Sequence, residues 1–309
     1  MPRPTFPALM RFRFRLRALE PIALPAYPGS TWRGLLGHGL RHSVCVTGAP
    51  VCDGCLLART CVYSTLFEIP ADAPANTPHP FLLDLDPEAP TRLAVGDSYR
   101  LGITLIGTAI AQLPYLIHAL TQAGTQGVGR ARGRFGLEAV DCESRLGAAD
   151  WNPIYRAGQQ GCRVPTALPP QAPPDIPERI GVKLRTPLRL KRAGRFVGAR
   201  EFDVDDFIRA LYRRLGALAA CHGLTPDVFM AGYPRPARGS IDMRVDEVRW
   251  FDWTRFSSRQ QRQMQFGGLL GELELSGDGL AVIWPALWLG QWTHIGKATA
   301  FGLGGYRLA

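Results

Sequence analysis

Residues 10–19 read MRFRFRLRAL, a stretch in which apolar and basic side chains alternate from Met10 to Ala18. Such a period of two predicts a β-strand whose apolar face is buried in a sheet. The opposite face would carry only basic side chains, namely Arg11, Arg13, Arg15 and Arg17. Four arginines on one face are unusual for a strand that is exposed only to solvent, so this face is expected to contact a polyanion.

This strand begins an ordered set of elements in the first half of the chain. A helix is predicted from about residue 31, because Ser30 can cap its first turn. The next elements are two strands, a helix and a last strand, at 81–85, 98–107, 108–124 and 133–142. The order strand, helix, strand, strand, helix, strand is ferredoxin-like, and RNA-recognition modules share it.

The second half repeats this order after a proline-rich segment. PTALPPQAPPDIP at 165–177 is typical of a semi-rigid, extended linker. QGVGRARGRFGL (126–137) and THIGKATAFGLGGYRL (293–308) both place a [VI]-G-[RK]-A motif before a final strand. We therefore predict an α+β protein of two tandem ferredoxin-like (RRM-like) domains. Residues 1–145 would form the first, with a cysteine-bearing helical insertion around 45–80, followed by a linker at 146–178 and a second domain at 179–309.

The charge balance favours a nucleic-acid partner. The 309 residues include 36 Lys or Arg against 26 Asp or Glu, a formal net charge of +10. A GC-rich genome would explain arginine in place of lysine, but it would not explain the positive excess. The sequence has no apolar run long enough to cross a bilayer and no signal-peptide pattern, so a cytoplasmic location is expected.

Six stretches carry a resemblance to a known family, in the same order along nearly the whole chain. They are PGSTWRGLLGHGLRH (28–42), a four-cysteine segment ending CVYSTLFE (61–68), GVGRARGRFGL (127–137), TPLRLKRAGRFV (186–197), TRFSSRQQRQMQFGGLLGELEL (254–275) and HIGKATAFGLGGYRL (294–308). Together they resemble the CRISPR-associated endoribonucleases of the RAMP superfamily, which cut precursor CRISPR RNA within its repeats. The cysteine segment resembles one branch only, and the CRISPR type stays open between type IV, type III and type I.

The resemblance implies a reaction and a set of partners. The ribose 2′-hydroxyl would attack the scissile phosphate in the repeat stem-loop without metal, leaving 2′,3′-cyclic phosphate and 5′-hydroxyl ends. The partners would be the repeat RNA or mature crRNA stem-loop and other CRISPR effector subunits, with no membrane. Two other hypotheses stay open: a non-catalytic RAMP subunit that only binds crRNA, and a zinc-dependent nucleic-acid module.

Candidate catalytic residues lie in and just before the first helix. The family often uses a histidine there as general base, and this chain offers His38 and His42, one helical turn apart. Arg41 could hold the phosphate, and Tyr27 lies where the family sometimes uses a tyrosine. The histidines could also be solvated surface residues or an i, i+4 metal pair, and arginines alone could drive the reaction.

Candidate RNA-binding residues come from the basic runs and from the glycine-rich end. Glycines allow backbone amides to approach phosphates closely, although a tight turn before a strand would explain them equally well. The predicted RNA contacts are Arg11, Arg13, Arg33, Arg130, Arg132, Arg134, Arg189, Lys191, Arg192, Arg195, Arg259, Arg262, His294, Lys297, Gly302 and Gly304.

Four of the seven cysteines cluster as C-x6-C-x2-C-x5-C, at Cys45, Cys52, Cys55 and Cys61. Four closely spaced thiolates could close a tetrahedral structural zinc site with no open position for catalysis. Reduced thiols in a loop-rich insertion are the alternative. No cofactor is expected for catalysis, and the structural zinc is a tentative expectation.

Overall fold

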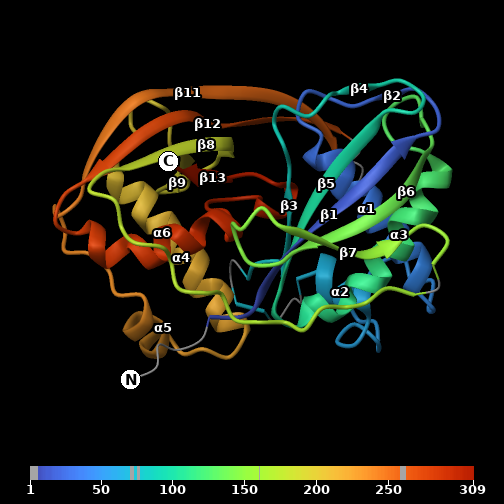
Figure 1. Cartoon of the computed structure of the whole chain (residues 1–309), viewed down its shortest axis with the longest axis horizontal. Helices are drawn as coiled ribbons and strands as arrows, with labels where there is room; N and C mark the ends of the chain where they lie inside the picture. The colour runs from blue at the N-terminus through green and yellow to red at the C-terminus, as the bar shows by residue number, and fades with distance from the viewer. Residues whose placement is uncertain (1–5, 70–72, 75–76, 160, 258–261) are drawn as a thin grey trace. The chain divides into compact units, whose positions relative to one another are not determined.

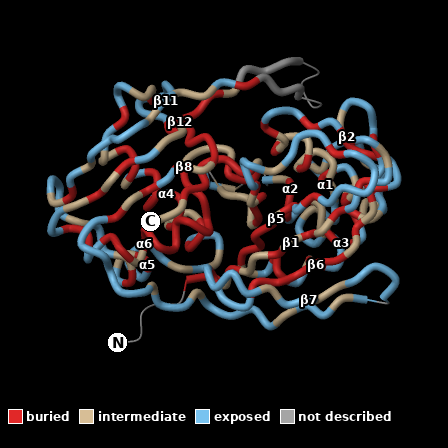
Figure 2. Tube along the Cα trace, turned by 45° about the horizontal axis from the view of Figure 1, so that its top comes forward, coloured by how far each residue is buried: buried red, intermediate tan, exposed pale blue. Residues whose placement is uncertain are grey.

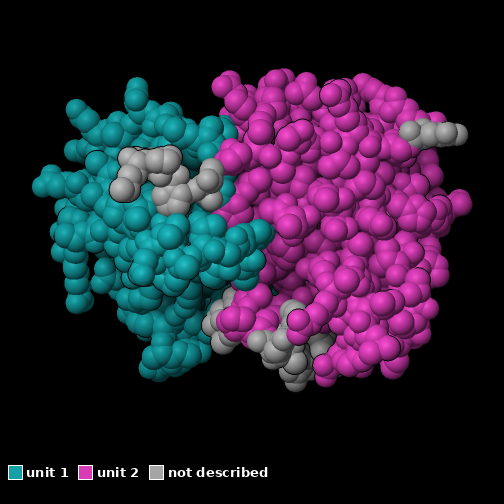
Figure 3. Space-filling view, turned by 90° about the horizontal axis from the view of Figure 1, so that it is seen from below, with its two compact units in different colours: residues 1–6, 170–309 teal, residues 7–169 magenta. Residues whose placement is uncertain are grey.

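The computed structural model describes residues 6–69, 73–74, 77–159, 161–257 and 262–309. It divides into two compact units, shown in magenta and teal in Figure 3. We call residues 7–169 the N-terminal unit and residues 1–6 with 170–309 the C-terminal unit. Each unit has its own antiparallel sheet and its own helices, so each is described by itself.

The N-terminal unit is built on a five-stranded sheet in the order β3-β5-β1-β6-β7 (Figure 1). Its strands are β1 (Leu9–Ala18), β3 (Phe81–Asp84), β5 (Ser98–Ile106), β6 (Phe135–Glu143) and β7 (Trp151–Arg156). Two short strands, β2 (Ile22–Ala23) and β4 (Arg92–Leu93), pair separately. The helices are α1 (Gly29–Val44), α2 (Val62–Phe67), the 3-10 helix η1 (Gly107–Gln112) and α3 (Leu113–Gln126).

The apolar face of β1 forms the centre of this unit's core, as its alternation predicts. Phe12 and Phe14 are 1% and 0% exposed. The core continues through α1, where Trp32 stacks on Tyr99 of β5 at 5.1 Å between ring centroids and donates its indole N–H to the phenol at 3.1 Å. Burying each large apolar side chain contributes roughly 1.5–3 kcal/mol, so this face accounts for much of the unit's stability.

The basic face of β1 is largely neutralised by carboxylates on neighbouring strands. Arg11 forms ion pairs of 2.6 Å with both Asp84 of β3 and Glu143 of β6. Arg15 pairs with Asp141, Arg17 pairs with Glu138, and Arg13 lies over the ring of Trp151, 3.9 Å from its centroid. Three of the four arginines on this face therefore have acidic partners across the sheet, and the RNA contacts expected at Arg11 and Arg13 stay predictions.

Part of the expected linker at 146–178 belongs to the sheet. Residues 151–156 form the edge strand β7, which pairs antiparallel with β6. The sequence of this strand contains Pro153, which argues against a central strand but is tolerated at a sheet edge. The described residues that follow, from 161 to 177, carry no regular secondary structure.

The C-terminal unit has a four-stranded sheet in the order β11-β12-β8-β13. Its strands are β8 (Ile180–Leu188), β11 (Asp242–Ser257), β12 (Arg262–Ser276) and β13 (Tyr306–Leu308), with a separate hairpin of β9 (Lys191–Arg192) and β10 (Arg195–Phe196). Its helices are α4 (Val204–Cys221), α5 (Pro226–Gly232), α6 (Leu280–Thr293) and the 3-10 helix η2 (Thr299–Phe301).

The helices α4 and α6 pack on one face of this sheet through the last strand. Tyr306 is fully buried, its hydroxyl donates to the carbonyl of Leu287 in α6 at 2.6 Å, and its ring lies 5.6 Å from Phe207 of α4. In α6 the indole N–H of Trp284 donates to the carbonyl of Pro174 at 2.7 Å, which ties the proline-rich segment to the helix. No helix among the described residues combines the length and apolarity needed to span a membrane.

Both sheets follow the ferredoxin-like connection that the sequence predicts. In each unit the first and third strands of the βαββαβ motif lie at the centre, and the second and fourth flank them. Figure 2 shows buried residues along the inner strands such as β1, β5 and β8, whereas the outer strands β7 and β11 are largely exposed or intermediate. The glycine-rich end of the chain is thus part of the fold, because β13 pairs with β8.

The double ion pair of Arg11 gives a testable stability prediction. Replacing Arg11 by Gln removes the cation that Asp84 and Glu143 share, and the Glu143 side chain is only 2% exposed. We expect a loss of about 3–5 kcal/mol in the free energy of unfolding, measured by urea denaturation.

The matched control is Arg17→Gln. Its side chain is 50% exposed and pairs with a partly exposed Glu138, so it should cost no more than about 1 kcal/mol. Equal effects of the two substitutions would show that burial does not set the strength of these pairs.

Candidate functional site

The helix α1 presents the two candidate histidines on one exposed face. Trp32, Leu36 and Leu40 recur every four residues and are 0–1% exposed, which fixes the buried side of the helix. His38 and His42 lie on the opposite side, one turn apart and exposed. Among the described residues neither imidazole forms a hydrogen bond or ion pair. Both can therefore meet a ligand and exchange protons with it.

Arg41, between these histidines, holds the cysteine-bearing loop. Its Nη2 donates to the carbonyl of Pro50 at 2.8 Å and also to the carbonyl of Ala49, and its guanidinium lies 5.6 Å from the ring centroid of Tyr63. The loop and the last turn of α1 are therefore held together by one side chain. Of the guanidinium's five N–H donors, those on Nη2 already have partners.

Arg33 pairs with a histidine that sequence reasoning did not single out. His79 Nδ1 lies 3.1 Å from the carbonyl of Leu66, and its Nε2 lies 3.2 Å from Nη2 of Arg33. One tautomer satisfies both contacts, with Nδ1 donating to the carbonyl and Nε2 accepting from the arginine. His79 lies between two prolines of a proline-rich loop with no periodicity, so no local pattern pointed to it.

Tyr27 lies in the hydrophobic core rather than at the surface of the helix. It is 9% exposed. Burial, with a smaller effect from the neighbouring Tyr99, raises the pKa of the phenol well above its usual value. The hydroxyl thus keeps its proton at neutral pH, which suits packing better than proton abstraction.

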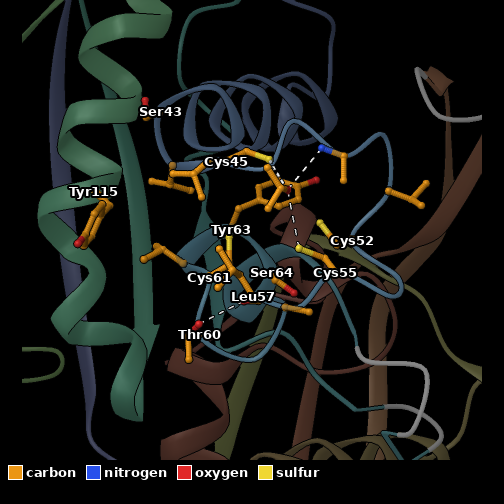
Figure 4. A pocket seen from close by; sticks show the side chains of 17 residues that line it. Ser43, Cys45, Cys52, Cys55, Leu57, Thr60, Cys61, Tyr63, Ser64 and Tyr115 are labelled. Carbon is orange, nitrogen blue, oxygen red and sulfur yellow. Dashed lines mark hydrogen bonds between the residues drawn. The ribbon is translucent and has the colours of Figure 1, made fainter.

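The four clustered cysteines line a pocket of about 320 Å³ together with Tyr63 and Tyr115 (Figure 4). The hydroxyl of Thr47 lies 3.8 Å from the Sγ atoms of both Cys45 and Cys55. In the described part of the chain, no three or more His, Cys, Asp or Glu side chains are grouped so that they could hold a metal ion. The tentative structural zinc is therefore not supported, because the thiols surround a pocket and a hydroxyl rather than closing a tetrahedron.

The basic turn before β6 contains both paired and exposed arginines. Val128 and Gly133 form an isolated bridge that closes the turn, and Arg130 and Arg132 are exposed within it. Arg134 instead pairs with Glu20, at 2.8 Å. The turn therefore offers two cations to solvent and uses the third to fix its own position.

The predicted RNA contacts of the β9–β10 hairpin have different environments. Arg192 is tied to the start of α4 through Asp203 at 2.8 Å and through Asp206. Arg189 is 7% exposed and donates to the carbonyl of Gly267 at 2.8 Å. Lys191 and Arg195 are exposed. Arg259 lies outside the described residues, and of Arg262 only the backbone, in β12, is described.

The glycine-rich loop uses many of its backbone groups to build the fold. The amides of Ile295, Lys297 and Gly304 donate to the carbonyls of Gly304, Arg189 and Pro187, and the carbonyl of Gly302 accepts from Thr186 at 2.7 Å. A Cβ at Gly304 would lie 1.8 Å from the carbonyl oxygen of Ile295, and its φ is +73°. His294 is 2% exposed, with Nδ1 3.2 Å from the carbonyl of Leu303.

Lys297 is the cation that this loop adds to the surface of the C-terminal unit. Partial burial and the nearby charges of Arg213 and Lys191 lower the pKa of its ammonium group. Burial is the larger cause, because it disfavours the charged form, and the repulsion from the two neighbouring cations adds to it. Arg213, exposed on α4, was not among the residues predicted from the sequence.

Comparison with solved structures supports the fold. A structure described as a partial Cas6-RT-Cas1–Cas2 complex matches 100% of this chain with a TM-score of 0.57 and 14% identity. This chain spans 47% of that longer chain. A Cas6 product complex matches with a TM-score of 0.59 and 16% identity over 98% of this chain and 99% of the other. Thermus thermophilus Cas6 matches over the same shares with a TM-score of 0.51 and 16% identity.

Family models assign both halves of the sequence. Residues 6–167 match the N-terminal domain family AF_1859_N, and residues 182–306 match the CRISPR-associated endoribonuclease Cas6. No curated protein matches the chain. The two matches follow one another along the sequence and correspond to the two ferredoxin-like sheets, and the second match assigns residues 182–306 to the Cas6 family of CRISPR-associated endoribonucleases.

Proposed function

We propose that this protein cuts precursor CRISPR RNA within its repeat stem-loop to give mature crRNA. The observation that carries the proposal is the exposed pair His38 and His42 on α1, in a chain whose residues 182–306 match the Cas6 family. Two imidazoles one turn apart can supply the base and the acid that cleavage of a phosphodiester requires. Exposed cations on the same unit, at Arg130 and Arg132, supply attraction for the RNA backbone.

The proposed step is an internal transfer at phosphorus. One imidazole takes the proton of the ribose 2′-hydroxyl, whose oxygen forms a bond to the adjacent phosphorus. The bond from phosphorus to the 5′-oxygen breaks, and the second imidazole gives that oxygen a proton. The products are a 2′,3′-cyclic phosphate and a 5′-hydroxyl, and neither water nor an electron is consumed. Because the two imidazoles can supply both proton transfers, we propose that the reaction is metal-independent.

The environments of the basic residues suggest which of them would contact RNA. Arginines already bound to carboxylates or carbonyls, such as Arg11 and Arg192, would lose those partners on turning to a phosphate. Arg130, Arg132, Lys191 and Arg195 are exposed and have more freedom to do so. We assign Tyr27, buried in the core, to packing.

A second function is a non-catalytic subunit that binds crRNA and delivers it to a CRISPR effector complex. The similar Cas6-RT-Cas1–Cas2 chain is described as part of a larger assembly, which favours a role with protein partners. The two functions are compatible if the enzyme keeps its product. They differ in one result, since the non-catalytic subunit would leave repeat RNA intact.

The first prediction concerns the two histidines. His38→Ala and His42→Ala should each lower the single-turnover rate of repeat cleavage by about 10² to 10⁴, because each removes a proton-transfer group. RNA binding should change little. Cleavage of end-labelled cognate repeat RNA in EDTA, with identification of the cyclic phosphate, measures both rate and product.

His118→Ala is the matched control, since His118 is an exposed histidine on α3. It should cleave at the wild-type rate. Unchanged rates in both α1 variants would indicate that arginines, not these histidines, catalyse the cleavage. Loss of cleavage in EDTA would contradict the metal-independent step.

The second prediction separates cations that bind RNA from cations that hold the fold. Arg130→Ala, at an exposed residue, should weaken binding of repeat RNA and reduce the slope of log affinity against log salt by about 1, with an unchanged thermal midpoint. Arg192→Ala should instead lower the thermal midpoint, because it leaves Asp206, whose side chain is 3% exposed, without its strongest partner. The reverse pattern would contradict this assignment.

A further inference from the structure

The C-terminal unit carries a row of aromatic side chains on the sheet face opposite its helices. Leu273 and Leu275 of β12 are 1% and 0% exposed and point toward the helices. Because strand side chains alternate, Phe266 lies on the other face. Trp253 of β11 is its cross-strand partner, and the two ring centroids are 5.7 Å apart.

This row continues in both directions beyond that pair. On β11, Phe251 stacks on Trp253 with centroids 5.8 Å apart and ring planes at 26°. On the other side, the guanidinium of Arg189 lies 4.2 Å from the ring centroid of Phe266 and 4.2 Å from that of Phe196 on β10. The ammonium of Lys191 lies 4.9 Å from the Phe196 centroid. Rings and cations therefore form one continuous series.

The position of the row in the sheet leaves it partly open. β12 pairs with β8 only from Leu269 to Leu275, so the ribbon that holds Trp253 and Phe266 runs past the end of β8 (Figure 1). Phe196 is 40% exposed, and Phe251 is half-buried. Among the described residues, the aromatic ring that stacks on Phe251 is that of Trp253. The two ends of the row are thus the rings most accessible to a ligand.

The charges of this face are paired at one end of the sheet and exposed without a carboxylate partner at the other. At the end away from the row, Glu272 and Glu274 face solvent and pair with Lys183 at 2.9 Å and Arg179 at 3.2 Å. Beside Phe196 the exposed charges are Lys191 and Arg195, for which the described residues show no carboxylate within ion-pair distance. The aromatic end of the face is therefore the electropositive end.

A planar, partly exposed ring beside unpaired cations matches the chemistry of a nucleotide. The π-face of a base stacks on an aromatic ring whatever the base is, and its phosphate binds a neighbouring cation. RNA-recognition modules place aromatics on the same uncovered face of a ferredoxin-like sheet. A protein partner would need an apolar surface without this charge.

We propose that the aromatic row of the C-terminal unit binds single-stranded RNA, with bases stacked on Phe196 and Phe251 and phosphates held by Lys191 and Arg195. Arg189 is a positioning residue, because its guanidinium fixes Phe196 and Phe266 while it is anchored on the carbonyl of Gly267 at 2.8 Å. The ligand class rests on the proposed function, in which RNA is the substrate. The row would hold unpaired nucleotides outside the stem-loop.

The test uses a ten-nucleotide single-stranded RNA without any repeat sequence, carrying one 2-aminopurine. Binding to the full chain should quench the fluorescence of the stacked base. Phe196→Ala and Phe251→Ala should each raise the dissociation constant about five- to a hundred-fold. Phe251→Trp should keep both binding and quenching. Phe251→Leu, which preserves apolar volume but removes the ring, should behave like the Ala variant and thereby excludes a purely packing role.

Tyr115→Ala is the matched control, because Tyr115 is an aromatic on α3 that is 46% exposed. It should bind the oligonucleotide as the wild type does. Wild-type affinity in both Ala variants, full replacement by leucine, or binding without quenching would each overturn the inference.

Cleavage measured on the same variants separates this inference from the proposed function. Intact repeat RNA together with ring-dependent binding would refute the nuclease and leave the aromatic row standing. Normal cleavage together with ring-independent binding would support the nuclease and refute the role of the aromatic row.

Discussion

The N-terminal unit depends on the burial of one guanidinium between two carboxylates. Arg11 lies on the central strand, and its side chain is only 12% exposed. Burying a charge costs hydration free energy, so it is tolerated only where opposite charges pair with it. Asp84 on β3 and Glu143 on β6 provide them from opposite sides. A slip of one residue in β1 would bring arginines into the apolar core, so these ion pairs and the alternation of the strand specify the same register.

The same logic distinguishes structural from functional charge elsewhere in the chain. Arg192 joins the β9–β10 hairpin to the start of α4, and Arg41 joins α1 to the cysteine loop. These side chains gain from existing partners, and a phosphate would have to replace those partners. In α1 the structural and the functional residues lie on opposite sides of one helix. The apolar side packs on the core, and this packing determines where His38 and His42 meet solvent.

The sequence predicted those features that depend on local pattern. The alternation at 10–19 and the order of elements were enough for the ferredoxin-like fold, and helical spacing was enough to place both histidines on one face. The partners of Arg11 could not be predicted, because Asp84 and Glu143 are far from it in sequence and follow no periodicity. β7 was missed because Pro153 argues against a strand, and the cysteine spacing did not reveal that Thr47 would lie between two thiols. The domain boundaries and the roles of the site residues stay predictions.

The two sheets share a topology, but the faces opposite their helices differ in chemistry. In the N-terminal unit this face is joined by ion pairs, so most of its charge is already neutralised and a polyanion gains little there. In the C-terminal unit the corresponding face carries stacked rings, and π-faces are not neutralised by a neighbour in the way that charges are. A net charge of +10 therefore overstates the electrostatic part of RNA binding, since that net value does not tell which cations are free to bind. Contacts that do not depend on salt, such as base stacking, would then carry a larger share of the affinity than composition suggests.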